Sequence, residues 1–249
     1  LVAAVLAFTG ATVSAEWPFD KPQRPELPTL ADNSWCENPV DLFILERLNE
    51  KGLSPSRQAS RRLLLRRLSV DLTGLLPSPG EVEKFLKDPA PDAWPRLVDR
   101  LLRSPRYGER WGQHWLDVVR FAQTNGYEHD AEKMEAWRYR DWVIEAFNSD
   151  LPYDEFVRQQ LAGDEFDPVS DHSIIATTFY RVGPWDQEPD DERMAQFDGL
   201  DDMLASCGNA FLGINVECAR CRDDPADAFP QREYYAMLSH FRNVKIDGT

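Results

Sequence analysis

Histidine, cysteine and basic residues are scarce in this 249-residue sequence, and this composition argues against some classes of function. The chain has four His and four Cys, and its 28 Lys and Arg stand against 43 Asp and Glu, a net charge of −15. Such an excess of negative charge argues against a nucleic-acid partner, because phosphate backbones attract basic surfaces. A nucleophile elbow, a metal-binding histidine pair and a phosphate-binding loop are also missing, so nothing specific supports a hydrolase.

Strand-like alternation of polar and apolar residues is missing as well, and apolar residues recur instead at helical spacing. Asn38 caps a run that ends at Gly52, Ser78 and Glu81 form a capping box, and Ser104 caps a further run. Two more amphipathic runs cover 61–72 and 94–102. The expected fold class is therefore mainly α, an irregular multi-helix domain with long loops and little or no β.

The first fifteen residues carry no charge and are apolar or small. Val13, Ser14 and Ala15 are typical of a small-residue cleavage site, so residues 1–15 are interpreted as a partial signal peptide. The segment is too short to remain across a bilayer. We therefore expect an exported chain, periplasmic or extracellular, with no transmembrane segment after cleavage.

Composition also predicts how the rest of the chain is divided. Residues 16–37 form an extended proline-rich arm, with four prolines between Pro18 and Pro28. Residues 38–243 form one helical domain. Residues 244–249 either begin a further segment of a longer chain or mark an artificial end.

Positive charge is concentrated in one stretch. Residues 57–110 hold ten Arg and two Lys against seven Asp and Glu, a net charge of +5, which leaves −20 for the remainder. Solvated helix faces and internal ion pairs are the favoured explanation, and a site for a polyanion is the alternative.

Two cysteines three positions apart, Cys218 and Cys221, come close to the C-x-x-C-H pattern of c-type haem attachment. The fifth position is Arg222, whose guanidinium has no lone pair to offer iron. A zinc site would need a second pair of ligands, and a thioredoxin-like pair would need a strand-to-helix turn. Neither context is visible, so the pair alone predicts no cofactor.

The residues around this pair resemble a known family. Cys218, Cys221, Asp223 and Asp227, followed by Gln231–Tyr235, are similar to the end of the planctomycete cytochrome-c-associated domain, an exported family of unknown function. Its members usually read C-A-x-C-H-D-H-K-x-D-P and then Q-R-E-Y-Y. Further blocks that resemble the family are 38–41, 71–75, 110–117, 124–127, 139–143 and 152–164.

The resemblance implies an exported redox or electron-transfer-associated module with haem c as its cofactor. Arg222 and Asp224 replace both family histidines, and Ala228 replaces a proline, so the haem motif is degenerate here. If haem is attached, Cys218 and Cys221 hold it and His114 is the remaining protein ligand. The machinery that attaches haem ordinarily recognises the whole C-x-x-C-H motif, which argues against haem attachment in this chain.

His114 is the strongest single candidate for a functional histidine, since it lies in one of the family-like blocks beside Trp111 and Trp115. A distal iron ligand and a general base are two roles for it. The simpler interpretation, which we favour, is a half-buried histidine hydrogen-bonded to a carboxylate such as Asp117.

Acidic residues gather in two places. Asp223, Asp224 and Asp227 can hold a hard cation, although Pro225 favours a tight turn instead. Between 186 and 202, eight of seventeen residues are Asp or Glu without EF-hand spacing, which favours a helix start over a calcium site.

Export would place Cys36, Cys207, Cys218 and Cys221 in an oxidising compartment. Four cysteines allow three full pairings, and the sequence does not choose among them. A disulfide between Cys218 and Cys221 competes with a bridge from Cys207 or Cys36 to one of the pair.

Two functions remain open. One is the redox module implied by the family resemblance, acting with an unknown protein or redox partner. The other is a non-catalytic periplasmic binding or scaffold domain, in which a structural disulfide stabilises the cysteine segment and tryptophan-rich helices form the partner surface.

Overall fold

The computed structural model of the protein describes residues 21, 23–223 and 229–244. Within these residues all regular secondary structure is helical, apart from one isolated bridge between Thr124 and Glu132. The mainly α fold with little or no β is thus confirmed. None of the helices in the described part of the chain is long and apolar enough to cross a bilayer. The expected signal peptide, residues 1–15, lies outside the described residues.

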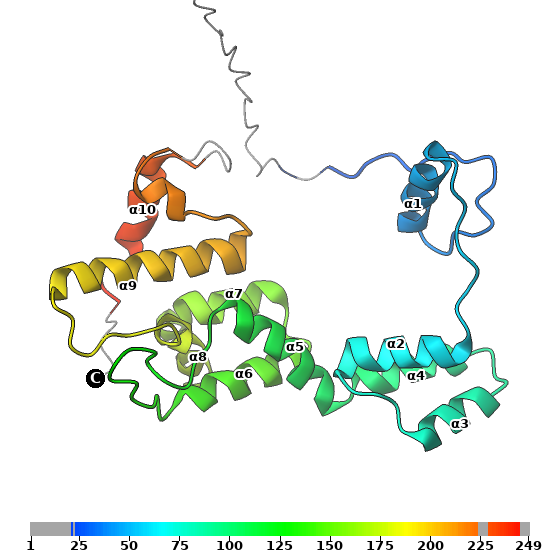
Figure 1. Ribbon diagram of the computed structural model, residues 1–249, viewed down its shortest axis with the longest axis horizontal. Helices are drawn as coiled ribbons and strands as arrows, with labels where there is room; N and C mark the ends of the chain where they lie inside the picture. The colour runs from blue at the N-terminus through cyan, green and yellow to red at the C-terminus, as the bar shows by residue number, and fades with distance from the viewer. Residues whose placement is uncertain (1–20, 22, 224–228, 245–249) are drawn as a thin grey trace, which may run out of the picture.

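Helix α1 (Pro39–Glu50) stands apart from the other helices (Figure 1). The Asn38 side chain accepts hydrogen bonds from the backbone N–H groups of Val40 and Asp41, and the Asp41 carboxylate accepts from the N–H of Asn38. This capping box fixes the start of the helix. Gly52, with φ of +64°, lies just beyond its end, so both expected boundaries are confirmed.

Three short helices form a separate small unit: α2 (Arg61–Thr73), α3 (Pro79–Lys87) and α4 (Ala93–Leu102). Their apolar faces meet in one core made of Leu65, Phe85, Ala93, Leu97 and Leu101. Arg61 joins α2 to the end of α3, because its guanidinium donates to the carbonyl oxygens of Phe85 at 2.7 Å and Asp88 at 2.9 Å. The unit therefore has its own packed interior.

Helices α5 (Pro105–Val118) and α6 (Ala136–Asn148) approach each other closely. A Cβ atom at Gly108 would lie only 2.4 Å from the carbonyl oxygen of Ile144. The Asn148 side chain accepts a hydrogen bond from the Gly108 N–H at 2.9 Å, where the two helices meet. Helix α5 also packs against α2 and so connects the small unit to the rest of the chain.

The largest core lies among α5, α6 and the elements that follow: α7 (Tyr153–Ala162), η1 (Gly163–Glu165), α8 (Asp171–Ala176) and η2 (Thr177–Arg181). Gln160 is fully buried in it, with its side-chain oxygen accepting from Tyr139 Oη at 2.6 Å and from Trp115 Nε1 at 3.1 Å. Its amide donates to the Phe156 carbonyl at 3.0 Å. This polar group is tolerated in the core because it is hydrogen-bonded on both sides.

A third core forms where the last elements pack together: α9 (Glu192–Cys207), η3 (Gly208–Leu212), η4 (Glu217–Arg220) and α10 (Gln231–Phe241). In Figure 1, α9 runs across one side of the α5–α8 group and carries α10 on its other side. Asp191 caps α9 by accepting from the N–H groups of Arg193 and Met194, both at 3.0 Å. The acidic stretch 186–202 does contain a helix start, as expected.

Candidate cysteine site

Cys218 and Cys221 lie on one short turn at the surface. Cys218 belongs to the 3₁₀-helix η4, Cys221 directly follows it, and both side chains are exposed. The backbone N–H of Cys221 donates to the carbonyl of Cys218 at 3.4 Å, an i to i+3 hydrogen bond. Side chains three apart in a 3₁₀-helix are eclipsed, so the two thiols lie on the same side of the turn.

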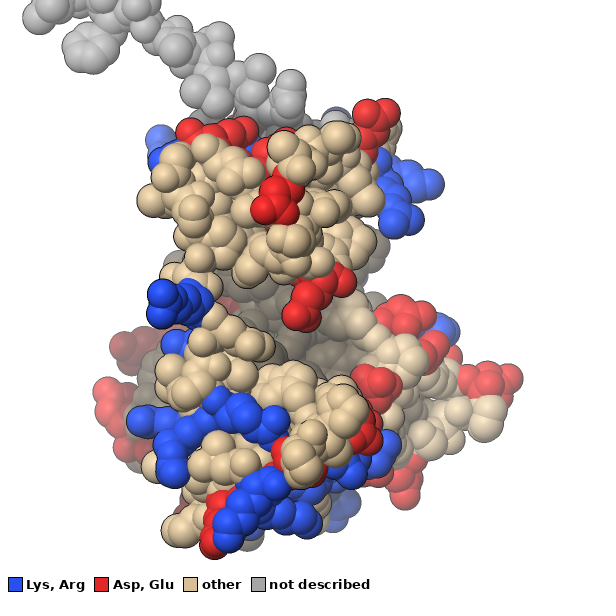
Figure 2. Space-filling view, turned by 90° about the vertical axis from the view of Figure 1, so that its right-hand side faces the viewer, with Lys and Arg blue, Asp and Glu red and all other residues tan. Residues whose placement is uncertain are grey.

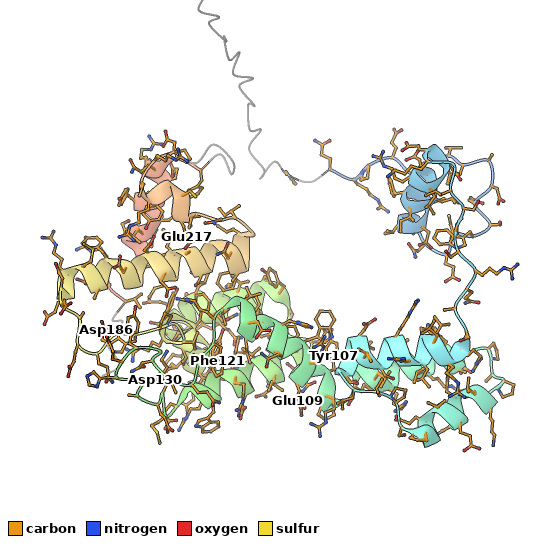
Figure 3. The ribbon with its side chains drawn as sticks, in the orientation of Figure 1. Tyr107, Glu109, Phe121, Asp130, Asp186 and Glu217 are labelled. Atoms are coloured by element: carbon orange, nitrogen blue, oxygen red, sulfur yellow. The ribbon has the colours of Figure 1, made fainter. Side chains whose placement is uncertain are left out.

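Arg220, between the two cysteines, fastens this turn to α9. Its guanidinium donates to Asp201 at 2.8 Å and to Asp198 at 2.9 Å. Asp201 also accepts a hydrogen bond from the hydroxyl of Tyr234, on α10. The cysteine turn is therefore held by two helices, and Figure 3 shows Glu217, at its start, beside both of them.

The Gln231–Tyr235 run holds the same turn from the other side. The Gln231 amide and the Tyr235 hydroxyl both donate to the Arg220 carbonyl, at 3.0 and 3.1 Å. The backbone N–H of Gln231 donates to the Asp223 carboxylate at 2.8 Å. The sequence identified this run as a family-like motif but predicted no role for it. In the structure its side chains and backbone hold the cysteine segment in place.

The expected carboxylate site is described only in part. Asp223 is exposed and caps the start of α10, whereas Asp224 and Asp227 lie outside the described residues. A hard-cation site at Asp223, Asp224 and Asp227 therefore stays a prediction.

All four cysteines are free thiols in this structure. Cys207 is buried in the main core, and burial raises the pKa of its thiol to about 12. Cys36 lies before α1, where desolvation and then the nearby carboxylates of Asp41 and Asp32 raise its pKa. The disulfide allowed by the sequence is not formed, and Cys207 is placed as a core residue, not as a partner of the exposed pair.

His114 has a different environment from the expected one. Its side chain is exposed on α5, and its ring lies edge-on to Trp111 with 5.6 Å between centroids. Asp117 accepts instead from the Gln113 amide at 2.6 Å. The prediction of a half-buried histidine bonded to Asp117 was therefore wrong. The side chains of Gln113, His114 and Asp117 all lie on the solvent-exposed side of α5.

The structure does not bring His114 and the cysteine pair into one metal site. Helix α5 packs against α6 and α2, whereas η4 packs against α10 and is fastened to α9 by Arg220. Among the described residues no three His, Cys, Asp or Glu side chains are grouped as metal ligands. Figure 3 labels Tyr107, in α5, and Phe121, which follows the end of this helix, and both lie away from Glu217.

A partly buried charged cluster was missed by the sequence. Arg120 has φ of +52° just after α5, and its Nε donates to Asp202, on α9, at 2.7 Å. Lys133 donates to the carbonyls of Val182 and Gly183, and burial, followed by repulsion from Arg120, lowers its pKa. No local pattern signals a contact between Arg120 and a residue 82 positions later.

These features define an all-helical domain with a supported, exposed thiol pair. Residues 39–246 match the family model described as PSCyt2, protein of unknown function (DUF1549), and the chain belongs to that family. This family description assigns no activity. Comparisons with curated proteins and with solved structures gave no match.

Proposed function

We propose that this chain is an exported redox-associated module whose reactive part is the thiol pair Cys218 and Cys221. The observation that supports the proposal is the placement of both thiols, exposed and on one side of a turn anchored by Arg220. Three residues of a 3₁₀-helix rise by about 6 Å. Disulfides join Cα atoms about 4.4–6.8 Å apart, so this turn is suited to closing and opening a disulfide.

The reaction is thiol–disulfide exchange with a disulfide of a partner protein. One thiol loses its proton and attacks a partner sulfur, which forms a mixed disulfide and releases one partner thiolate. The second cysteine then attacks the mixed disulfide, so that Cys218 and Cys221 become a disulfide. The partner leaves as a dithiol, having taken the two electrons and two protons of the pair.

The residues present do not fit a c-type haem. Cys218 and Cys221 offer thioether positions, but Arg222 has no lone pair for iron and His114 lies on α5. The association with c-type cytochromes is therefore carried by family resemblance alone, and no step of the proposed reaction uses haem.

The second candidate function is a binding scaffold. Its specific support is the exposure of four tryptophans among the described residues, each at least 37 % accessible: Trp35, Trp94, Trp111 and Trp137. Tryptophan is enriched in protein interfaces, where its large apolar surface is covered by a partner. In this function the cysteines contribute only to stability.

Intact mass and absorbance of the exported protein test these functions together. We expect a colourless protein that loses two hydrogen atoms in mass on oxidation by glutathione disulfide and regains them with dithiothreitol. Cys218→Ser with Cys221→Ser should abolish the change, whereas Cys36→Ser should retain it. A Soret band with a haem-sized mass that survives denaturation would replace the proposal with a cytochrome. If the pair stays reduced over the whole range of glutathione potentials, the redox proposal fails and the binding scaffold becomes the favoured function.

A further inference from the structure

Three arginines on α2 face solvent without an ionic partner. Arg62, Arg66 and Arg67 are exposed, and no carboxylate of the described residues lies within ion-pair distance of them. The arginines of the neighbouring helix α4 do have ionic partners: Arg96 pairs with Asp88 and Arg100 pairs with Glu81, each at 2.8 Å. Internal ion pairs therefore account for Arg96 and Arg100 of α4 but not for Arg62, Arg66 and Arg67 of α2.

The outer face of α2 combines these charges with apolar side chains. Leu65 and Ser69 mark the buried side of the helix. Arg62 and Arg66 are four residues apart along one flank of the helix, and Leu63 and Arg67 are four residues apart on the side opposite Leu65, so each pair are neighbours on the surface. Leu63 is 39 % exposed. Guanidinium groups and an exposed leucine thus share one surface.

Two further apolar side chains follow directly after the helix. Leu75 and Leu76 are 53 % and 67 % exposed, and they come immediately after Gly74, which ends α2 with φ of +70°. Isolated exposed leucines are ordinary on protein surfaces. Two in succession at a turn, beside an unpaired basic helix, form a small apolar tip next to positive charge.

Charge is also separated along the molecule. Figure 2 shows Lys and Arg gathered over the lower of the two lobes that face the viewer, which is the lobe formed by α2–α4. Residues 57–110 have a net charge of +5, whereas the rest of the chain has −20. The acidic helix α9 lies at the opposite end of the long axis (Figure 1). An anionic surface would attract one end and repel the other.

We propose that the outer face of α2, with Leu75 and Leu76, binds an anionic lipid surface. Arginine matches phosphate geometry with paired N–H donors, and apolar side chains beside it enter the boundary between headgroups and acyl chains. The exposed leucines favour lipid over a purely ionic polymer, which would use only the guanidinium groups. The repelled acidic end sets the orientation, with α9 and the cysteine turn directed away from the surface.

Sedimentation of the full chain with vesicles tests this proposal. We expect binding to phosphatidylcholine vesicles that contain phosphatidylglycerol, none to phosphatidylcholine alone, and weaker binding as salt is raised. Each arginine near an anionic surface contributes to the free energy of binding. Replacing Arg62, Arg66 and Arg67 together with Gln should therefore weaken binding at least about tenfold. Glutamine keeps the helix propensity, and circular dichroism checks the fold.

A matched variant separates location from total charge. Arg138, Arg158 and Arg232, exposed and paired with neighbouring glutamates, lie on α6, α7 and α10. Replacing these three with Gln removes the same charge and should leave vesicle binding unchanged within about twofold. Leu75→Ser with Leu76→Ser should weaken binding severalfold without changing its salt dependence.

Three results would overturn the proposal. The first is equal binding to vesicles with and without phosphatidylglycerol. The second is equal loss in the two arginine triple variants. The third is capture of soluble polyglutamate with no binding to vesicles, which would assign the α2 face to an acidic polypeptide.

Discussion

At the scale of single residues, burial separates the four cysteines into different chemical roles. Cys218 and Cys221 are exposed, Cys36 is half-buried and Cys207 lies in the core. A thiol reacts as its thiolate, and desolvation opposes the charged form. The raised pKa of Cys207, about 12, therefore marks it as inert in the folded protein.

Alkylation should reveal this difference. With iodoacetamide at neutral pH, we expect Cys218 and Cys221 to be modified in the folded protein and Cys207 only after unfolding in denaturant. Peptide mass mapping locates each modification. Equal rates for Cys207 and Cys218 would contradict the burial of Cys207.

At the scale of elements, the contact between α5 and α6 depends on a residue without a side chain. Gly108→Ala places a methyl group 2.4 Å from the Ile144 carbonyl oxygen, which is backbone and gives way only if the helices separate. We expect a loss of about 3 kcal/mol or more in the free energy of unfolding, measured by urea denaturation.

Gly80→Ala is the matched control. Gly80 lies in the first turn of α3, and a Cβ atom there meets nothing within 4 Å. Because alanine has less backbone freedom to lose, this change should raise the free energy of unfolding by about 0.5–1 kcal/mol. Similar losses for the two variants would show that the α5–α6 distance is not limited by Gly108.

The capping box of α3 predicts a dependence on pH. Hydrogen bonds from the Ser78 backbone, then from the Arg100 and Ser78 side chains, hold the pKa of Glu81 below its ordinary value of 4.5. A carboxylate with a lowered pKa in the folded state stabilises above its unfolded pKa, and this stability is lost as pH falls through the folded pKa.

Glu81→Gln should therefore be less stable than the natural protein at pH 7, by about 0.5–1.5 kcal/mol, and the difference should shrink below pH 4.5. Urea denaturation at several pH values measures it. Glu83→Gln, which removes only an exposed pair with Lys87, is the control and should cost little at any pH. A difference that is constant with pH would contradict the role of the Glu81 carboxylate.

At the scale of the whole molecule, three separate cores predict that the chain does not unfold as one unit. The α2–α4 core is joined to the main core through the contact of α2 with α5, and the third core lies between α9 and α10. Parts with separate interiors open with separate free energies.

Hydrogen exchange should detect this separation. Leu97→Ala removes a buried side chain from the α2–α4 core and should cost about 2–5 kcal/mol locally, with faster exchange in α2–α4 and little change in α6 or α9. Leu204→Ala, in the third core, should instead speed exchange in α9 and α10 and cause little change in α2–α4. Faster exchange throughout the chain in either variant would indicate a single cooperative unit.

The sequence by itself determined where the capped helices begin and that the fold is mainly α. Caps such as Asn38, Ser78 and Asp191 act on backbone groups two or three residues away, so a local pattern contains the whole interaction. Only the tertiary structure decided which side chains meet. The pairing of Arg120 with Asp202, the support of Arg220 by Asp201 and Tyr234, the burial of Cys207 and the exposure of His114 all depend on how distant segments pack, and a local pattern carries no information about that packing.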